Sequence, residues 1–415
     1  MTLMTRPRHA DSHKLMPGEV PLDIAETFFS RTDERGIIRA GNGVFRRVSG
    51  YDWDGLLNAP HKLVRHADMP KGVFHMMWRD IQKGRVVAAY VKNKSRDGRF
   101  YWVLSVISPV EGGYMSVRIK PTSAIHQRVI TLYEDLLAAE AEGMTPEQSA
   151  AHLLTLLEQD GFANYEVFQS LALMTEVVER AKRTERAVES WQSRFRLMSD
   201  SIIQIQQETE EMLAAFRSIR TVPMNMRILA SRLENAGGPI SAISVNYGAM
   251  LDEMTTWVQN FSRGENSPFA RIRDSILSGQ FLAFVALVQM EMSQRFGKQT
   301  TSAMGEIDIP GEKAKLVMQA AEYRKRATSA LKVVEMEADH LARSVLDMKR
   351  YVTGLSSTRM MCKIESAMLD DSGEALAGIV DQLDYCQNTI ETRLSRISEL
   401  NGLIQSNTAM LRATA

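Results

Sequence analysis

The chain has 415 residues, enough for two to four domains, and its 44% apolar and 24% charged residues are ordinary for a folded protein. The 50 Lys and Arg residues balance 50 Asp and Glu residues, so the overall charge lacks the basic excess typical of nucleic-acid-binding proteins. Two cysteines, Cys362 and Cys386, are too few for a disulfide framework and fit a reducing compartment.

The first 25 residues contain no apolar stretch of the signal-peptide kind. The longest apolar run, Phe281 to Val288, is far shorter than the ~20 residues that a membrane span needs. We therefore expect a cytoplasmic protein without a transmembrane segment. Residues 1–124 carry about eight excess positive charges, which suit an anionic cofactor, an acidic partner or simply a solvated face.

The first 120 residues predict a small α+β domain. Residues 1–24 contain three prolines, Pro7, Pro17 and Pro21, and show no periodic spacing of apolar residues, which indicates a flexible lead. Five strand-like stretches follow, at residues 27–31, 37–40, 86–92, 100–106 and 114–120. Asn42 is placed to cap a short helix that ends near Gly50, and further short helices fill the gap before the third strand.

From Ile125 onwards the periodicity is helical. Thr145-Pro146-Glu147-Gln148 is a strong helix start, with Thr as the N-cap and Gln three residues later. Apolar residues then recur at 3–4 spacing from Val188 to Ile219, interrupted only by Thr209, and the stripe resumes after Pro223.

Two arms of this kind, joined by a short break, predict a helical hairpin. The first pair breaks at residues 237–239 and descends from Ile240 to Phe261. The second ends its rise at Leu355, breaks at 370–374 and descends to Ile404, with Arg393 as the charged exception. Four apolar seams cannot stay exposed, so we expect either an intrachain, pseudo-dimeric four-helix bundle or a homodimer.

These patterns predict six segments. They are a flexible N-terminal lead (1–24), an α+β domain (25–121), connecting helices (122–162), a first helical hairpin (163–262), a connector with an apolar helix (263–311) and a second helical hairpin (312–412).

Specific phrases resemble a known domain. Residues 60–70 and 91–103, together with Met77-Trp78 and residues 113–118, resemble the pocket segment and central hairpin of PAS sensor domains from bacterial aerotaxis receptors. The resemblance covers about residues 25–121. It implies a PAS fold with a five-stranded antiparallel sheet, a non-covalent FAD and a role in reporting redox state or oxygen to a helical output.

The resemblance also implies which residues would hold the cofactor. They are Arg65, His66 and Asp68 in the pocket segment, Asn42 on the first short helix, Asn93 on the central strand, and Trp102. A flavin needs polar partners for its pyrimidine edge, cations for its phosphates and an apolar slot for its rings. Two positions depart from the pattern, because Ala67 replaces a proline and Val87 a tryptophan. The alternative is that the pocket-segment residues cap a helix and satisfy one another, with another ligand or none.

The hairpins resemble a degenerate chemoreceptor signalling hairpin. Glu234-Asn235-Ala236 and Glu365-Ser366-Ala367 are similar to the receptor tip, whereas Arg227 and Arg359 stand at partner-contact positions. This implies signalling proteins as partners, among them a chemotaxis histidine kinase, its adaptor or receptors, with weak or altered coupling. The acidic run at 206–211 resembles receptor methylation pairs, although a solvated helix face is the commoner explanation.

Other function classes find little support. Residues 1–124 contain no cysteine, which excludes cysteinyl-adduct photochemistry there. The sequence has no Gly-rich phosphate loop, zinc-ligand spacing or catalytic triad signature. We therefore expect a signal transducer rather than an enzyme. The alternative is a cofactor-free PAS adaptor or scaffold that binds other signalling proteins.

Overall fold

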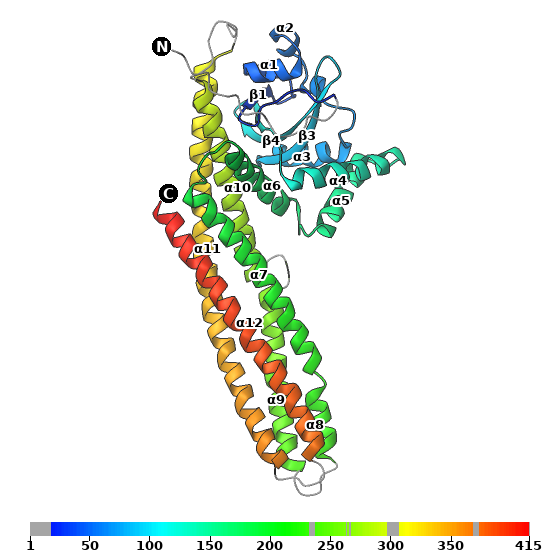
Figure 1. The fold of residues 1–415 in the computed structure, drawn as a ribbon, viewed down its shortest axis with the longest axis vertical. Coiled ribbons are helices and arrows are strands. Elements are labelled where there is room, and N and C mark those ends of the chain that lie inside the picture. Colours follow the sequence, from blue (N-terminus) through cyan, green and yellow to red (C-terminus); the bar gives the residue numbers. More distant parts are fainter. Residues whose placement is uncertain are drawn as a thin grey trace, which may run out of the picture. The chain divides into compact units, whose positions relative to one another are not determined.

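The computed structural model describes residues 18–231, 237–262, 264, 267–296, 307–367 and 373–414 (Figure 1). The chain divides into two compact units. One contains Met1–Val188 and Leu277–Ala327, and we call it the sheet unit. The other contains Glu189–Ile276 and Thr328–Ala415, and we call it the bundle unit.

The predicted α+β fold with a long helical continuation is confirmed. The strands are β1 (Thr27–Asp33), β2 (Ile38–Gly41), β3 (Val87–Lys94), β4 (Phe100–Val110) and β5 (Gly113–Ile119). They form one sheet in the order β2-β1-β5-β4-β3, and every neighbouring pair is antiparallel. Both faces of the sheet are covered, which explains why the strands are buried almost without alternation.

Four short helices occupy the chain between β2 and β3. They are α1 (Gly43–Ser49), α2 (Trp53–Leu56), the 3₁₀ helix η1 (His61–Val64) and α3 (Lys71–Gln82). The side chain of Asn42 caps α1 by accepting a hydrogen bond from the amide of Phe45 at 3.2 Å, and Gly50 ends the helix with φ 70°. Both local predictions are confirmed, since each depends on neighbouring residues alone.

The N-terminal lead is shorter than predicted. Residues 1–17 lie outside the described part of the chain, but residues 18–24 pack against the sheet unit. The amide of Val20 donates to the carbonyl of Phe100 at 2.7 Å, and the side chain of Leu22 is buried. The proline content of this segment favoured a flexible lead, although Val20 and Leu22 supply apolar side chains that pack against the sheet unit.

Helices from two distant parts of the sequence cover the second face of the sheet. They are α4 (Ala124–Ala141), α6 (Tyr165–Arg183), α10 (Pro268–Arg295) from Leu277, and α11 (Ile309–Ala367) as far as Ala327. Helix α5 (Pro146–Gln159) packs instead on α3 and α4. The capping box predicted at Thr145 is present. Helix α6 was expected to open the first hairpin, but it belongs to the sheet unit and packs on β3, where the hydroxyl of Tyr165 donates to the carbonyl of Ala88 at 2.8 Å.

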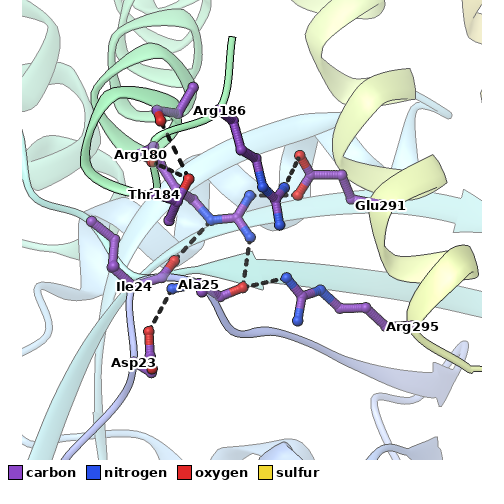
Figure 2. A network of polar contacts seen from close by, with 9 residues as sticks. Asp23, Ile24, Ala25, Arg180, Thr184, Arg186, Glu291 and Arg295 are labelled. Carbon is purple, nitrogen blue, oxygen red and sulfur yellow. Dashed lines mark hydrogen bonds and ion pairs between the residues drawn. The ribbon is translucent and has the colours of Figure 1, made fainter. Parts of the chain in front are cut away.

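An arginine cluster fastens α10 to the start of the sheet (Figure 2). Arg180 of α6 donates to both carbonyls of residues 24–25, each at 2.9 Å, and Arg295 of α10 donates to the second of them. Arg180 and Arg186 also pair with Glu291 of α10. Segments more than a hundred residues apart in sequence are thereby held next to β1.

The bundle unit contains α7 (Ser190–Ile219), α8 (Val222–Ala230), α9 (Gly237–Ser262), α10 as far as Ile276, the remainder of α11, and α12 (Gly373–Ala413). The predicted seam of α7 is buried from Phe195 to Ile219, and the predicted break after it separates α7 from α8. Helices α7 and α12 run antiparallel, because Arg194 contacts Asn407 whereas Glu208 contacts Arg393. The predicted tip residues at 234–236 and 370–372 lie outside the described residues, as do the side chains of Ser366 and Ala367.

The charged exception in the last seam is resolved by a shift of one residue. Leu394 is fully buried in the core, and Arg393 lies beside it and pairs with Glu208 at 2.9 Å and Glu211 at 2.5 Å, both on α7. An ideal helix drifts from a strict seven-residue repeat, so a neighbouring residue takes the core position.

Helix α10 bears on the membrane expectation. Within the described ranges it is the one helix whose length and apolar composition would suffice to cross a membrane. However, 67% of its most apolar stretch is buried inside the protein, as in the core helix of a folded domain.

Candidate functional site

The sheet unit contains a partly open cavity of about 340 Å³ between the sheet and α3. One part of its wall is apolar and aromatic, formed by Phe74, Met77, Trp78, Ile81, Val91, Ile107 and Tyr114. The other part is polar and includes Ser30, His61, Asn93, Ser105, Ser116 and Arg118. Such a volume lies at the lower end of the range for small-molecule sites, and the mixed lining is typical of them.

A buried cation dominates the polar wall. Arg118 is only 4% exposed, and its guanidinium donates to the hydroxyl of Ser30 and to Nε2 of His61, both at 2.9 Å. It also lies over the rings of Phe28 and Phe45, at 5.6 Å and 5.9 Å from the ring centroids. No Asp or Glu is found among the described residues that line the cavity.

The protonation states around Arg118 follow from burial. Desolvation lowers the pKa of Arg118 to about 10, so the guanidinium stays charged at neutral pH. Burial and the adjacent guanidinium lower the pKa of His61 to about 3. His61 is therefore neutral, and its Nε2 accepts from Arg118. A charged group held inside a protein without a counter-charge is costly, so this wall favours a ligand with an anionic or strongly accepting edge.

Asn93 completes the polar wall. Its side chain is 3% exposed and lines the cavity. A carboxamide offers two donors and an acceptor to a bound molecule. An amide or imide edge on a ligand would pair with it. The pyrimidine ring of a flavin has such an edge, so the donor set fits that group.

A second, more open hollow of about 730 Å³ adjoins the cavity and shares Pro60, Lys62 and Arg65 with it. This outer groove is lined by two further lysines, Lys71 and Lys94, by His66, whose pKa burial lowers, and by α4 near its C-terminal end. Glu140, the one acidic side chain among the described residues that line it, accepts hydrogen bonds from the amide of Gly72 and the hydroxyl of Ser149 at 3.0 Å and 2.7 Å. The groove is therefore suited to phosphates.

Arg65 stands at the junction of cavity and groove. Its guanidinium lies 3.9 Å from the centroid of the Phe74 ring and donates to the carbonyl of Met69 at 3.4 Å. His66, its neighbour, accepts from the amide of Asp68 through Nδ1 at 3.1 Å. Asp68 lies outside both hollows with 53% of its side chain exposed, and it pairs with Lys92 at 2.5 Å. Of the three residues predicted from the pocket segment, Arg65 and His66 therefore face the site and Asp68 does not.

The other two predicted site residues lie elsewhere. Asn42 is fully buried at the start of α1, where its amide also donates to the carbonyl of Thr27 at 3.2 Å. Trp102 lies on the opposite sheet face, and its ring meets His126 of α4 edge-on at 5.1 Å. Neither lines the cavity or the groove. Asn93, Arg65 and His66 are the predicted residues that the fold brings together.

Sequence reasoning assigned no role to His61, Arg118 or Trp78, although all three lie in the quoted PAS-like phrases. The available signal was Arg118, a charged residue between Val117 and Ile119 in a strand with buried neighbours. Trp78 supplies a tryptophan ring in the cavity wall, whereas Val87 is buried outside that wall.

Comparison with known proteins gives partial matches. No protein-family model matches the chain. The aerotaxis receptor of Escherichia coli (strain K12) is 40% identical over 123 residues, which are 28% of this chain and 24% of the receptor. The nitrogen fixation regulatory protein of Klebsiella pneumoniae is 31% identical over 86 residues, which are 21% of this chain and 17% of that protein. The chain thus spans a quarter or less of each relative, and these similarities support a PAS-type sensor domain.

Proposed function

We propose that this protein is a PAS-type signal transducer that binds a flavin, FAD in particular, and relays its redox state through the helical bundle. The observation that carries the proposal is the inner cavity, whose apolar slot ends at Asn93 and at the buried charge of Arg118, with no Asp or Glu among the described lining residues. The flavin rings would occupy this cavity. The phosphates would lie in the outer groove, among Lys62, Arg65 and Lys71.

The partial similarity to an aerotaxis receptor supports this assignment. When bound, a flavin supplies reversible one- and two-electron chemistry. The chain's own residues would bind it, exclude water and respond to its change in charge. Action by binding and conformational change, without catalysis, is part of the proposal. So is a signalling protein as the partner, with weak coupling to a chemotaxis kinase or adaptor.

The test is the visible absorption spectrum of the purified full chain, followed by identification of any cofactor released on denaturation. We expect flavin absorbance, and we expect Arg118→Met to reduce flavin retention while Arg99→Met, a change at an exposed arginine paired with Asp97, does not. Absence of flavin absorbance after reconstitution with excess FAD would refute the flavin proposal and favour the cofactor-free adaptor.

A further inference from the structure

Strand β1 has the cavity on one side and a buried ion pair on the other. Ser30 and Thr32 line the inner cavity, and Ser30 is a hydrogen-bond partner of Arg118. Arg31 lies between them, so its side chain projects to the opposite face. There its Nε donates to a carboxylate oxygen of Glu312 at 2.6 Å. Glu312, only 2% exposed, lies in the first turn of α11.

Strand β4 repeats this arrangement. Ile107 lines the cavity, and Ser108 faces the opposite side, where its hydroxyl accepts from the amide of Gln289 on α10 at 3.0 Å. Gln289 donates at 3.0 Å to the side-chain oxygen of Gln319 on α11. Gln319 in turn donates to the carbonyl of Pro109 at 2.6 Å. Two strands of the cavity wall are therefore bonded to the same helix.

The first turns of α11 present one side of the helix to this sheet face. Glu312, Leu316, Gln319 and Tyr323 recur at 4-3-4 spacing, which places them on one side of a helix. Leu316 and Tyr323 are buried, and the two polar members make the contacts just described. Helix α11 then continues without interruption to Ala367, and its residues from Thr328 belong to the bundle unit.

We propose that residues 309–323 of α11 are the output element of the sensor, with Glu312 as its positioning residue. This rests on the proposed function in so far as the cavity ligand supplies the stimulus. A change of charge on the ligand would alter the hydrogen bond between Arg118 and Ser30. The resulting shift of β1 would pass through Arg31 to Glu312 and into the continuous helix.

The pairing of Glu312 depends closely on the position of Arg31. The second carboxylate oxygen of Glu312 is buried and has no hydrogen-bond partner among the described residues. Within the same part of the chain, the one other cation that pairs with Glu312 is Lys315, at 3.4 Å from the oxygen that Arg31 binds. Buried polar contacts depend on geometry more steeply than apolar ones do. A small displacement of Arg31 therefore leaves Glu312 poorly paired unless the helix follows.

The main experiment is amide hydrogen exchange of the full chain with oxidised and with dithionite-reduced flavin. In the wild type, reduction should change the exchange rates of amides in residues 309–323 several-fold. Glu312→Gln should abolish this response with an unchanged flavin spectrum. Glu322→Gln, the same change at an exposed site on the same helix, should keep it. A response that persists in Glu312→Gln, or no response in the wild type despite bleaching of the flavin, overturns the proposal.

A second arm does not need a flavin. Arg118→Met removes the cavity cation directly, so it should change exchange in residues 309–323, and the change should be absent in the double variant with Glu312→Gln. If no flavin is found, the proposed ligand fails, yet this cycle still decides the route. Equal effects of Arg118→Met with and without Glu312 would overturn it. If Glu312→Gln does not fold, Gln319→Met interrupts the other polar contact on the same helix face and replaces it.

Discussion

The sheet unit and the bundle unit bury their polar groups in different ways. Glu176 of α6 is fully buried and accepts hydrogen bonds from Tyr90 at 2.9 Å, Thr122 at 2.6 Å and Ser123 at 2.7 Å. In the bundle, the core layers are mainly apolar, and Arg393 lies at their margin with 33% of its side chain exposed, although Glu337 is buried and pairs with Arg271. Directional contacts fix one arrangement, whereas repeated apolar layers tolerate small shifts. The difference is what the proposed function requires, in which the sheet unit detects a change and the bundle unit transmits it.

The sharpest way to break this contrast is Glu176→Ala. It leaves the amides of Thr122 and Ser123 and the hydroxyl of Tyr90 without their common acceptor inside the protein. We expect a loss of about 3–5 kcal/mol in the free energy of unfolding of the sheet unit. Hydrogen exchange of the β4 amides measures this unit by itself. Glu166→Ala, at a site with 60% of the side chain exposed, is the control, and a loss under about 1 kcal/mol for Glu176→Ala would count against the contrast.

Leu383→Ala tests the apolar core of the bundle. Leu383 is fully buried on α12, so truncation removes transfer free energy and leaves a cavity, costing about 2–5 kcal/mol. Leu403→Ala removes the same atoms at a position that is 46% exposed and should change stability by less than about 0.5 kcal/mol. Urea unfolding followed by helical circular dichroism compares the two. Equal effects would mean that the seam does not hold the bundle together.

The sequence predicted what neighbouring residues determine. The caps at Asn42 and Thr145 and the stop at Gly50 depend on side chains within a few positions, and all three are confirmed. The pairing of Arg31 with Glu312 joins residues 281 positions apart, and no local pattern specifies it. A strict seven-residue repeat assigned the core position to Arg393, whereas Leu394 occupies it. The reason is that α-helical geometry drifts relative to that repeat.

The site shows the same division. Asn93, Arg65 and His66 belong to phrases whose resemblance carried a role, and they line the two hollows. Trp102 was assigned from the same hairpin, but strand alternation places it on the other sheet face, against α4. The role of Arg118 depends on Ser30, which the strand order places on the neighbouring strand, and on His61 of η1. That order cannot be deduced from a single strand.

Two residues of the pocket segment, Arg65 at the junction of cavity and groove and Asp68 on the surface, should contribute differently to ligand binding. Arg65 faces both hollows, so Arg65→Ala should weaken flavin binding on the order of 10–100-fold, the value of a lost charge-assisted contact. Asp68 is exposed and paired with Lys92, so Asp68→Ala should weaken binding by less than about threefold. Titration of the apoprotein with FAD, followed by fluorescence quenching, measures both. A larger loss for Asp68→Ala would place the phosphates beyond the groove.

Stability of the sheet unit should fall with acid because of His61. Its pKa is lowered in the folded protein to about 3 from an unfolded value of 6.5, so between these values only the unfolded chain gains the proton. The contribution of neutral His61 to the free energy of unfolding is fully present above pH 6.5. It decreases as pH falls below 6.5, by at most about 1.4 kcal/mol per pH unit. His61→Gln should remove this part of the slope between pH 7 and 5.5, measured by hydrogen exchange of β4. An identical slope in both proteins would mean that His61 is not the titrating group.

The smallest expected effect concerns the marginal charges of the bundle. Arg393 pairs with Glu208 and Glu211 of α7, but a third of its side chain is exposed, so solvent screens the attraction and holding three side chains in place costs entropy. Arg393→Gln should therefore lower the free energy of unfolding of the bundle by only about 0.2–1 kcal/mol, and the difference should shrink in ~1 M salt. Arg350→Gln, at a pair within α11 that is 82% exposed on the arginine side, is the matched control and should be close to neutral. A loss above about 2 kcal/mol for Arg393→Gln would show that the bundle, like the sheet unit, depends on a directional polar contact. In that case a polar contact would fix the bundle helices in one register. The contrast between directional polar contacts in the sheet unit and shift-tolerant apolar layers in the bundle unit would then not hold.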